Sequence, residues 1–312
     1  MQFHQPPQYS DEDLRKQAET AREAFISRRR TMEQQCADFY NQVFDKASED
    51  VQRVLEETNH LRCLNERADL LTESGILDLL RYMQRPTVSQ DDFKILSGTG
   101  TAAPSRFVDP ETAQNAVEYI NRTINQKIFP WLEDAERGPH AAELSAAKTA
   151  VAALIADQKT KTLMRTSPSR SQEDQVRNLL QSHGYATVPA RTIEVHLQFP
   201  KPMELFSREA SVGSAKADIV AGLPDGRLLL LECKVSNSEV NSFKRLNHEV
   251  TDKTEKWRRA YGESVLCGCV LQGVFKTENL IAAQREGVAI FWSDNLTPLG
   301  TFIEDLKRLS AT

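Results

Sequence analysis

The chain has 312 residues, of which 40% are hydrophobic and 27% are charged, and its formal net charge at pH 7 is −5. This length is sufficient for a sizeable core and for two folded regions. No apolar run reaches the roughly 18 residues of a membrane span, and the polar N-terminus lacks the apolar segment of a secretory signal. We therefore expect a cytoplasmic protein without a membrane segment.

The charge is unevenly distributed along the chain. Residues 1–160 contain 19 lysines and arginines against 26 aspartates and glutamates, a net charge of −7, whereas residues 161–312 contain 20 against 18, a net charge of +2. A local positive surface is sufficient for contact with phosphates, and an acidic remainder limits nonspecific binding. The second half is the better candidate for contact with nucleic acid.

The first half of the sequence is predicted to be mostly helical. Helical patterns, separated by prolines and glycines, cover residues 11–35, 36–58, 68–84, 110–127 and 141–163. We expect residues 1–164 to form a helical N-terminal region and residues 165–312 to form a second domain, with a linker at Ser167–Arg170.

After the linker the pattern becomes α/β. A helix is expected over Gln172–Ser182 with Ser171 as its N-cap, followed by a strand at Thr192–Gln198. Two further strands, Ala217–Ala221 and Leu228–Val235, flank the sequence Gly-Leu-Pro-Asp-Gly. This sequence favours a tight turn, because proline fixes φ and glycine accepts positive φ.

The remaining elements alternate between helix and strand. They are a helix at Glu239–Tyr261, a strand at Val265–Leu271, a helix at Glu278–Arg285, a strand at Val288–Trp292 and a helix at Pro298–Leu309. This order predicts an α/β fold with a mixed central sheet and helices on both faces.

Three residues on the predicted hairpin indicate chemistry. Side chains two positions apart on a strand share a face, so Glu232 and Lys234 project together, and the hairpin brings Asp218 beside them. Adjacent carboxylates bind Mg²⁺, and a nearby lysine can orient a water molecule or neutralise developing charge. The alternative is an ordinary ion pair at a strand end, with Asp218 capping a turn. Because buried charges are costly unless they are paired, the four leucines that lead into Glu-Cys-Lys favour the site.

The pattern of Asp218, Glu232 and Lys234, Asp-x13-Glu-Cys-Lys, resembles the PD-(D/E)xK nuclease superfamily over about residues 165–295. Ala217 stands where that pattern has its name-giving proline, which is its loosest position. Two further segments, Val235–Asn247 and Arg165–Glu173, resemble type II restriction endonucleases of the XamI type.

This resemblance implies a restriction-endonuclease-like fold with Mg²⁺ as cofactor. Asp218 and Glu232 would bind the metal, and Lys234 would position the attacking water. Many superfamily members carry a further glutamate on the helix before the sheet, and Glu173 is the candidate here. Acidic residues are also favoured in a first helical turn for structural reasons alone, so that alternative stays open.

The implied activity is hydrolysis of DNA phosphodiester bonds at a short specific duplex site, giving double-strand breaks. A palindromic site suits a homodimer, because each strand then meets one identical active site. A companion DNA methyltransferase acting on the same site and a prokaryotic cytoplasm also follow from the resemblance. The helical region would supply dimer contacts, DNA clamping or both.

Four residues near the three site residues are candidates for DNA contact. Lys216 has the same strand parity as Asp218, and the helix after Lys234 carries Asn241, Lys244 and Arg245. Asparagine and arginine read base edges, and lysine and arginine hold phosphates. We expect the apolar stripe of this helix to pack on the sheet; its members are Val240, Phe243, Val250, Trp257 and Tyr261. A solvated polar face is the alternative to DNA contact.

Other kinds of site have weaker support. The five cysteines show no paired CxxC motif and are expected to be buried thiols, with Cys233 facing away from Glu232. The six histidines show no paired ligand spacing. Two other functions stay open, namely a repair or structure-specific PD-(D/E)xK nuclease and a noncatalytic DNA-binding protein that keeps the fold.

Overall fold

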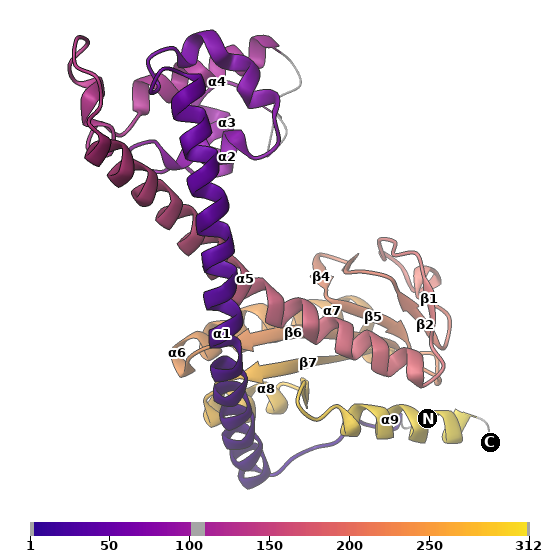
Figure 1. Cartoon of the computed structure of the whole chain (residues 1–312). Coiled ribbons are helices and arrows are strands. Elements are labelled where there is room, and N and C mark those ends of the chain that lie inside the picture. Colours follow the sequence, from indigo (N-terminus) through magenta and orange to yellow (C-terminus); the bar gives the residue numbers. More distant parts are fainter. Residues whose placement is uncertain (1–2, 101–109, 311–312) are drawn as a thin grey trace. The chain divides into compact units, whose positions relative to one another are not determined.

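The computed structural model describes residues 3–100 and 110–310. The chain divides into two compact units (Figure 1), which we call the sheet unit, Met1–Met32 with Arg165–Thr312, and the helical unit, Glu33–Met164. Helices α1 (Asp11–Glu57) and α5 (Ala141–Ser182) contribute residues to both units. None of the described helices is long and apolar enough to cross a membrane.

The sheet unit is built on a six-stranded mixed sheet with the strand order β1-β2-β5-β6-β7-β8. The β1–β2, β6–β7 and β7–β8 pairs are parallel, whereas β5 pairs antiparallel with both β2 and β6. These strands are β1 (Ala186–Val188), β2 (Glu204–Phe206), β5 (Ile219–Gly222), β6 (Leu228–Ser236), β7 (Val265–Gly273) and β8 (Ala289–Trp292). A separate antiparallel pair consists of β3 (Ala210–Val212) and β4 (Ala215–Ala217).

Helices cover both faces of this sheet, as predicted. Residues of α5 and α9 (Thr297–Ser310) pack on the face that carries Leu229 and Leu231. The opposite face packs against α7 (Asp252–Tyr261), α8 (Thr277–Arg285) and the start of α1. Side chains alternate along β6, so Glu232 and Lys234 point to the face that α7 covers. Cys233 points to the other face, which α5 and α9 cover.

The helical unit has a core of its own. It contains α2 (Ile76–Tyr82), α3 (Gln90–Leu96), α4 (Pro110–Thr123) and the 3₁₀ helices η1 (Leu64–Thr72) and η2 (Pro130–Leu132). Trp131 is fully buried, and its indole N–H donates to the carbonyl of His60 at 2.9 Å.

The predicted helix over 68–84 is wrong, because Gly75, with φ of 92°, separates η1 from α2. The two helices predicted over 11–58 form the single helix α1, since no proline or glycine interrupts residues 11–57.

Two predictions at the start of the sheet unit are also wrong. Ser167–Arg170 does not form a linker, and Ser171 is not an N-cap, because α5 is continuous from Ala141 to Ser182. The strand expected over Thr192–Gln198 is reduced to a bridge at Ile193 followed by the 3₁₀ turn η3 (His196–Gln198). The side-chain oxygen of Gln198 accepts the amides of Glu194 and Val195, which closes the turn.

The helix after β6 is interrupted by a wider turn. It consists of α6 (Glu239–Phe243), the π-helix η4 (Lys244–Thr251) and α7, and the 3₁₀ turn η5 (Gly262–Ser264) follows. A π-helix bonds residues five apart and so shifts which side chains face the core. Val240 and Phe243 are therefore 83% and 50% exposed, contrary to the predicted apolar stripe, while Ser242 is buried in their place. Val250, Trp257 and Tyr261 are buried as expected.

Candidate active site

Asp218 lies in a break between two strands. The predicted strand Ala217–Ala221 is wrong in this detail, because β4 ends at Ala217 and β5 begins at Ile219. The Oδ2 atom of Asp218 accepts the backbone N–H of Cys233 at 2.8 Å. The carboxylate thus takes an amide that an unbroken strand would pair with a carbonyl, which accounts for the break.

Arg177 of α5 holds the backbone at this break and at the end of β2. Its guanidinium donates to the carbonyl of Asp218 at 2.9 Å and to the carbonyl of Phe206 at 2.7 Å. These bonds fix the chain that carries Asp218 against α5.

Glu232 and Lys234 meet Asp218 as the hairpin predicted. Nζ of Lys234 lies 2.7 Å from Oε2 of Glu232 and 3.3 Å from Oδ2 of Asp218. The Glu232 side chain is 0% exposed, whereas that of Asp218 is 20% exposed. One ammonium group is therefore shared between two carboxylates, one inside the core and one at the surface.

The Glu232 carboxylate is incompletely satisfied. Oε1 of Glu232 is buried and has no hydrogen-bond partner among the residues that the structure describes. Burial raises the pKa of Glu232, and the charge of Asp218 raises it further, although Lys234 opposes both effects. Burial lowers the pKa of Lys234, but the charges of Glu232 and Asp218 outweigh burial, so its net pKa is raised and the ammonium stays charged at neutral pH. A divalent cation suits this combination, since it would satisfy the unpaired oxygen of Glu232.

Glu173 lies close enough to interact with this group. Burial raises the pKa of Glu173, and the charge of Asp218 is the second cause. Its Oε2 atom lies 3.6 Å from a guanidinium nitrogen of Arg177, the residue that also bonds the Asp218 carbonyl. Glu173 therefore interacts electrostatically with Asp218 and forms an ion pair with Arg177, which holds the Asp218 backbone.

Two residues of the site were not anticipated from the sequence. Nζ of Lys253 lies 2.8 Å from Oε2 of Glu232, and Oε2 of Glu249 lies 4.0 Å from Nζ of Lys234. Glu249 and Lys253 are four residues apart on one helical stretch, a spacing that brings side chains to a common face. That spacing, with Val250 as a core residue between them, was the available signal.

The four candidate DNA contacts lie on the surface around these residues. Lys216 is exposed at the centre of β4, and its ammonium pairs with Glu209 at 3.1 Å. Asn241 and Lys244 are exposed, and Arg245 is half-buried, on the helical stretch after β6.

Cysteine chemistry has no support at this site. Burial raises the pKa of the Cys233 thiol well above its ordinary value, and the nearby carboxylates add to the shift. A protonated thiol is a weak nucleophile. All five cysteines are free, and four are buried as predicted, namely Cys36, Cys233, Cys267 and Cys269. The prediction is wrong for Cys63, which is only half-buried.

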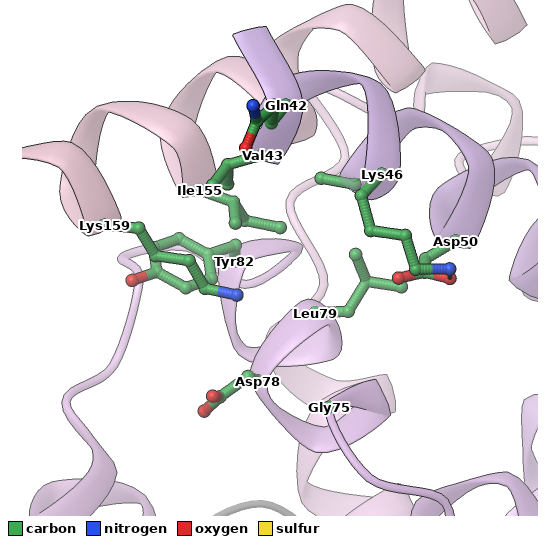
Figure 2. Close-up of a pocket in the computed structure, with 11 residues that line it drawn as sticks. Gln42, Val43, Lys46, Asp50, Gly75, Asp78, Leu79, Tyr82, Ile155 and Lys159 are labelled. Carbon is green, nitrogen blue, oxygen red and sulfur yellow. Dashed lines mark hydrogen bonds and ion pairs between the residues drawn. The ribbon is translucent and has the colours of Figure 1, made fainter. Parts of the chain in front are cut away.

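A separate cavity of about 270 Å³ lies in the helical unit, among α1, α2 and α5 (Figure 2). Its acidic residues Asp50 and Asp78 already pair with Lys46 and Arg81, at 2.9 Å and 2.7 Å. Apolar side chains line part of the cavity, namely Val43, Leu79 and Ile155. Among the lining residues there is no carboxylate pair around a shared lysine, so the candidate chemistry belongs to the sheet unit.

The described parts of the chain, 3–100 and 110–310, contain no preformed group of three or more His, Cys, Asp or Glu side chains arranged for a metal ion. Mg²⁺ does not require such a cage, because it keeps several waters and takes one or two protein carboxylates plus substrate phosphate. Asp218 and Glu232 match that requirement in number and kind.

A mixed sheet flanked by helices, with an acidic residue before one strand and Glu-x-Lys on the next, defines a restriction-endonuclease-like nuclease. The chain belongs to the XamI restriction endonuclease family, which matches residues 62–292. It is 31% identical over 258 residues to the type II restriction enzyme XamI of Xanthomonas campestris pv. amaranthicola, covering 82% of this chain and 93% of that enzyme.

Among solved structures, the protein VC1899 from Vibrio cholerae aligns with a TM-score of 0.28 and 12% identity. The alignment covers 87% of this chain and 57% of that one, so the chain spans little more than half of its length.

Proposed function

We propose that the protein is a Mg²⁺-dependent type II restriction endonuclease that cuts both strands of duplex DNA at a short specific site. The observation that carries the proposal is the unpaired, buried Oε1 of Glu232 beside Asp218 and Lys234. A buried carboxylate oxygen without a partner is costly, and a cation would remove that cost. Membership of the XamI family supports DNA as the substrate.

Asp218 and Glu232 would hold the metal, and Lys234 would act as a cation. When bound, Mg²⁺ polarises the scissile phosphate and acidifies a water molecule. Because its pKa is raised, Lys234 donates hydrogen bonds rather than accepting a proton, so it can orient the attacking water and stabilise the charge that develops on the phosphate. Glu173 would assist through its charge next to Asp218.

A polar hollow next to the site offers contacts for the DNA backbone. It has a volume of about 330 Å³ and includes Arg191, Arg208 and Lys216 in its lining. Lys216 precedes Asp218 by two residues, so phosphates bound here would lie near the cutting site. Asn241, Lys244 and Arg245 would add contacts from the helical stretch after β6, with Asn241 and Arg245 suited to base edges.

We also propose a homodimer that acts on a palindromic site, with a companion methyltransferase that protects the same sequence. A two-fold enzyme presents one active site to each strand of such a site. The helical unit would contribute dimer contacts, DNA clamping or both. A cytoplasmic location in a prokaryotic cell follows from the same proposal.

The test is digestion of phage-sized duplex DNA with Mg²⁺ and, separately, with EDTA. The wild-type protein is compared with Lys234→Ala, which removes the shared ammonium, and with Lys256→Ala, which removes an exposed lysine of α7. We expect discrete Mg²⁺-dependent fragments from the wild type and from Lys256→Ala, and none from Lys234→Ala.

The other outcomes identify the rival functions. A smear or progressive trimming of ends would indicate a nuclease that recognises structure or ends rather than sequence. Tight DNA binding without Mg²⁺ and without any cutting would indicate a noncatalytic DNA-binding protein.

A further inference from the structure

Glu232 is bound by two lysines. Nζ of Lys253, the second residue of α7, lies 2.8 Å from Oε2 of Glu232, and Nζ of Lys234 lies 2.7 Å from the same oxygen. The other oxygen, Oε1, is buried and has no hydrogen-bond partner within residues 3–100 and 110–310. Both ammonium groups therefore contact one carboxylate oxygen and leave the second for a further cation.

Lys253 also contacts the chain that leads to Asp218. Its Nζ donates to the backbone carbonyl of Lys216 at 2.8 Å, two residues before Asp218. One side chain of α7 thus links the two segments that carry the acidic residues. The Lys253 side chain is 26% exposed and that of Lys234 is 11% exposed, so Lys253 is the more accessible of the two lysines.

The charges of these four side chains cancel. Asp218 and Glu232 carry two negative charges, and Lys234 and Lys253 carry two positive charges. A divalent cation that approaches the carboxylates is attracted by them and repelled by both ammonium groups, over distances at which charges interact strongly near a protein surface. Removal of Lys253 alone would leave Glu232 still held by Lys234.

We propose that Lys253 is a positioning residue that holds Glu232 and keeps the affinity of the DNA-free site for divalent cations low. This inference rests on the proposed function, because it takes Asp218 and Glu232 as the metal ligands. A DNA phosphate carries one negative charge and offsets one ammonium group, so metal binding becomes more favourable when DNA is present. Lys253 thereby couples loading of the site to binding of the substrate.

The test measures cation binding directly, in the full-length protein without DNA. Mn²⁺ prefers the same oxygen ligands as Mg²⁺, and its unbound concentration is measured by electron paramagnetic resonance during stepwise addition. Lys253→Met and Lys253→Gln remove the charge, whereas Lys253→Arg keeps it. Lys256→Met removes an equal charge from an exposed position of the same helix. Asp218→Asn identifies the site.

We expect Lys253→Met and Lys253→Gln to bind Mn²⁺ more tightly, by on the order of tenfold at low ionic strength. Lys253→Arg and Lys256→Met should bind it as the wild type does, and Asp218→Asn should bind it more weakly. Circular dichroism shows which variants are folded. The glutamine variant, which retains a hydrogen-bond donor for Glu232, provides the result if the methionine variant does not fold.

Two results would overturn the proposal in different ways. If both neutral variants bind Mn²⁺ like the wild type, or if Lys256→Met tightens binding equally, Lys253 does not control cation affinity. The metal site itself still stands in that case, provided that Asp218→Asn has lost affinity. If Asp218→Asn binds Mn²⁺ like the wild type, the cation is bound elsewhere, and the metal ligands of the proposed function fail together with this inference.

Discussion

The backbone amide of Cys233 donates a 2.8 Å hydrogen bond to Oδ2 of Asp218. Asp218, which lies in the break between β4 and β5, is therefore held by the main chain of β6, the strand that carries Glu232. Lys234 approaches the same Oδ2 atom at 3.3 Å. The Asp218 carboxylate is thus held beside β6 by this bond and by the pairing of β5 with β6, which begins at the next residue.

Replacement of Asp218 by asparagine should abolish cleavage and leave the fold intact. The amide oxygen of asparagine can still accept the Cys233 N–H, but the negative charge is lost. We expect the cleavage rate to fall by more than about a hundredfold, since even partners that only support a metal ligand cost about 10–100-fold. Rates of plasmid cleavage in Mg²⁺, with thermal melting as the stability check, measure this.

Asp174→Asn is the matched control, because it removes one negative charge, as Asp218→Asn does, from an exposed residue of α5. It should cleave at the wild-type rate. Near-normal cleavage by folded Asp218→Asn would remove Asp218 from the active site.

The parts of the fold that were predicted correctly are those with strong local patterns. The Leu228–Val235 run and the Pro-Asp-Gly turn fixed β6 and its hairpin, and with them the meeting of Asp218, Glu232 and Lys234. The break at Asp218 could not be predicted, because it depends on a side-chain bond to a residue 15 positions away.

The sequence pattern also did not predict which side chains of the helix after β6 are buried and which contact the site. A 3.6-residue period predicted that Val240 and Phe243 would be buried, but Ser242 of α6 points inward instead. Its hydroxyl accepts hydrogen bonds from the Lys276 backbone amide and the Asn279 side-chain amide. Lys253 was missed for a different reason. Its partner Glu232 lies on a strand, and no helical period shows which strand residue a helix will face.

Lys244 provides a test of the proposed DNA surface. If its exposed ammonium contacts a phosphate, Lys244→Ala should weaken binding to all duplex sequences alike. The slope of log K against log salt concentration should become shallower by about 0.9, the value for one phosphate contact. Fluorescence anisotropy in EDTA, at several salt concentrations, measures this without cleavage.

Lys256→Ala serves as the control for this measurement, since Lys256 is exposed on α7 and no DNA role is assigned to it. A slope identical to that of the wild type in Lys244→Ala would show that Lys244 faces solvent in the complex.

Glu304 should contribute to stability in a pH-dependent way. Hydrogen bonds from His183 and Lys307 lower the pKa of Glu304 from its ordinary value of 4.5 to about 2. Because the folded-state pKa is depressed, the stabilisation is fully present above pH 4.5 and is lost as the pH falls through about 2. His183 follows the end of α5, and Glu304 belongs to α9, so the contact joins two helices on one face of the sheet.

The measurement compares melting temperatures of the wild type and Glu304→Gln from pH 7 to pH 2. The variant should melt at a lower temperature near neutral pH, and the difference should close as the pH approaches 2. Glu278→Gln, at an exposed residue of α8, should show little difference at any pH. A gap for Glu304→Gln that stays constant down to pH 2 would contradict the assignment.

Gly222 should be intolerant of any side chain, because β5 ends there against the chain that leads to β2. A Cβ at this position would lie 2.1 Å from the carbonyl oxygen of Lys201 and 2.7 Å from that of Pro200. Both atoms belong to backbone that is fixed by the bond from the Met203 amide to the Gly222 carbonyl, so the clash cannot be relieved by a side-chain rotation. We expect Gly222→Ala to lower the free energy of unfolding by about 1–3 kcal/mol, as overpacking of a core does.

The control is Gly138→Ala, where an added Cβ would meet nothing within 4 Å and the backbone needs no positive φ. Urea denaturation of both variants measures the difference, and equal midpoints for the two would show that the contact at Lys201 relaxes without cost.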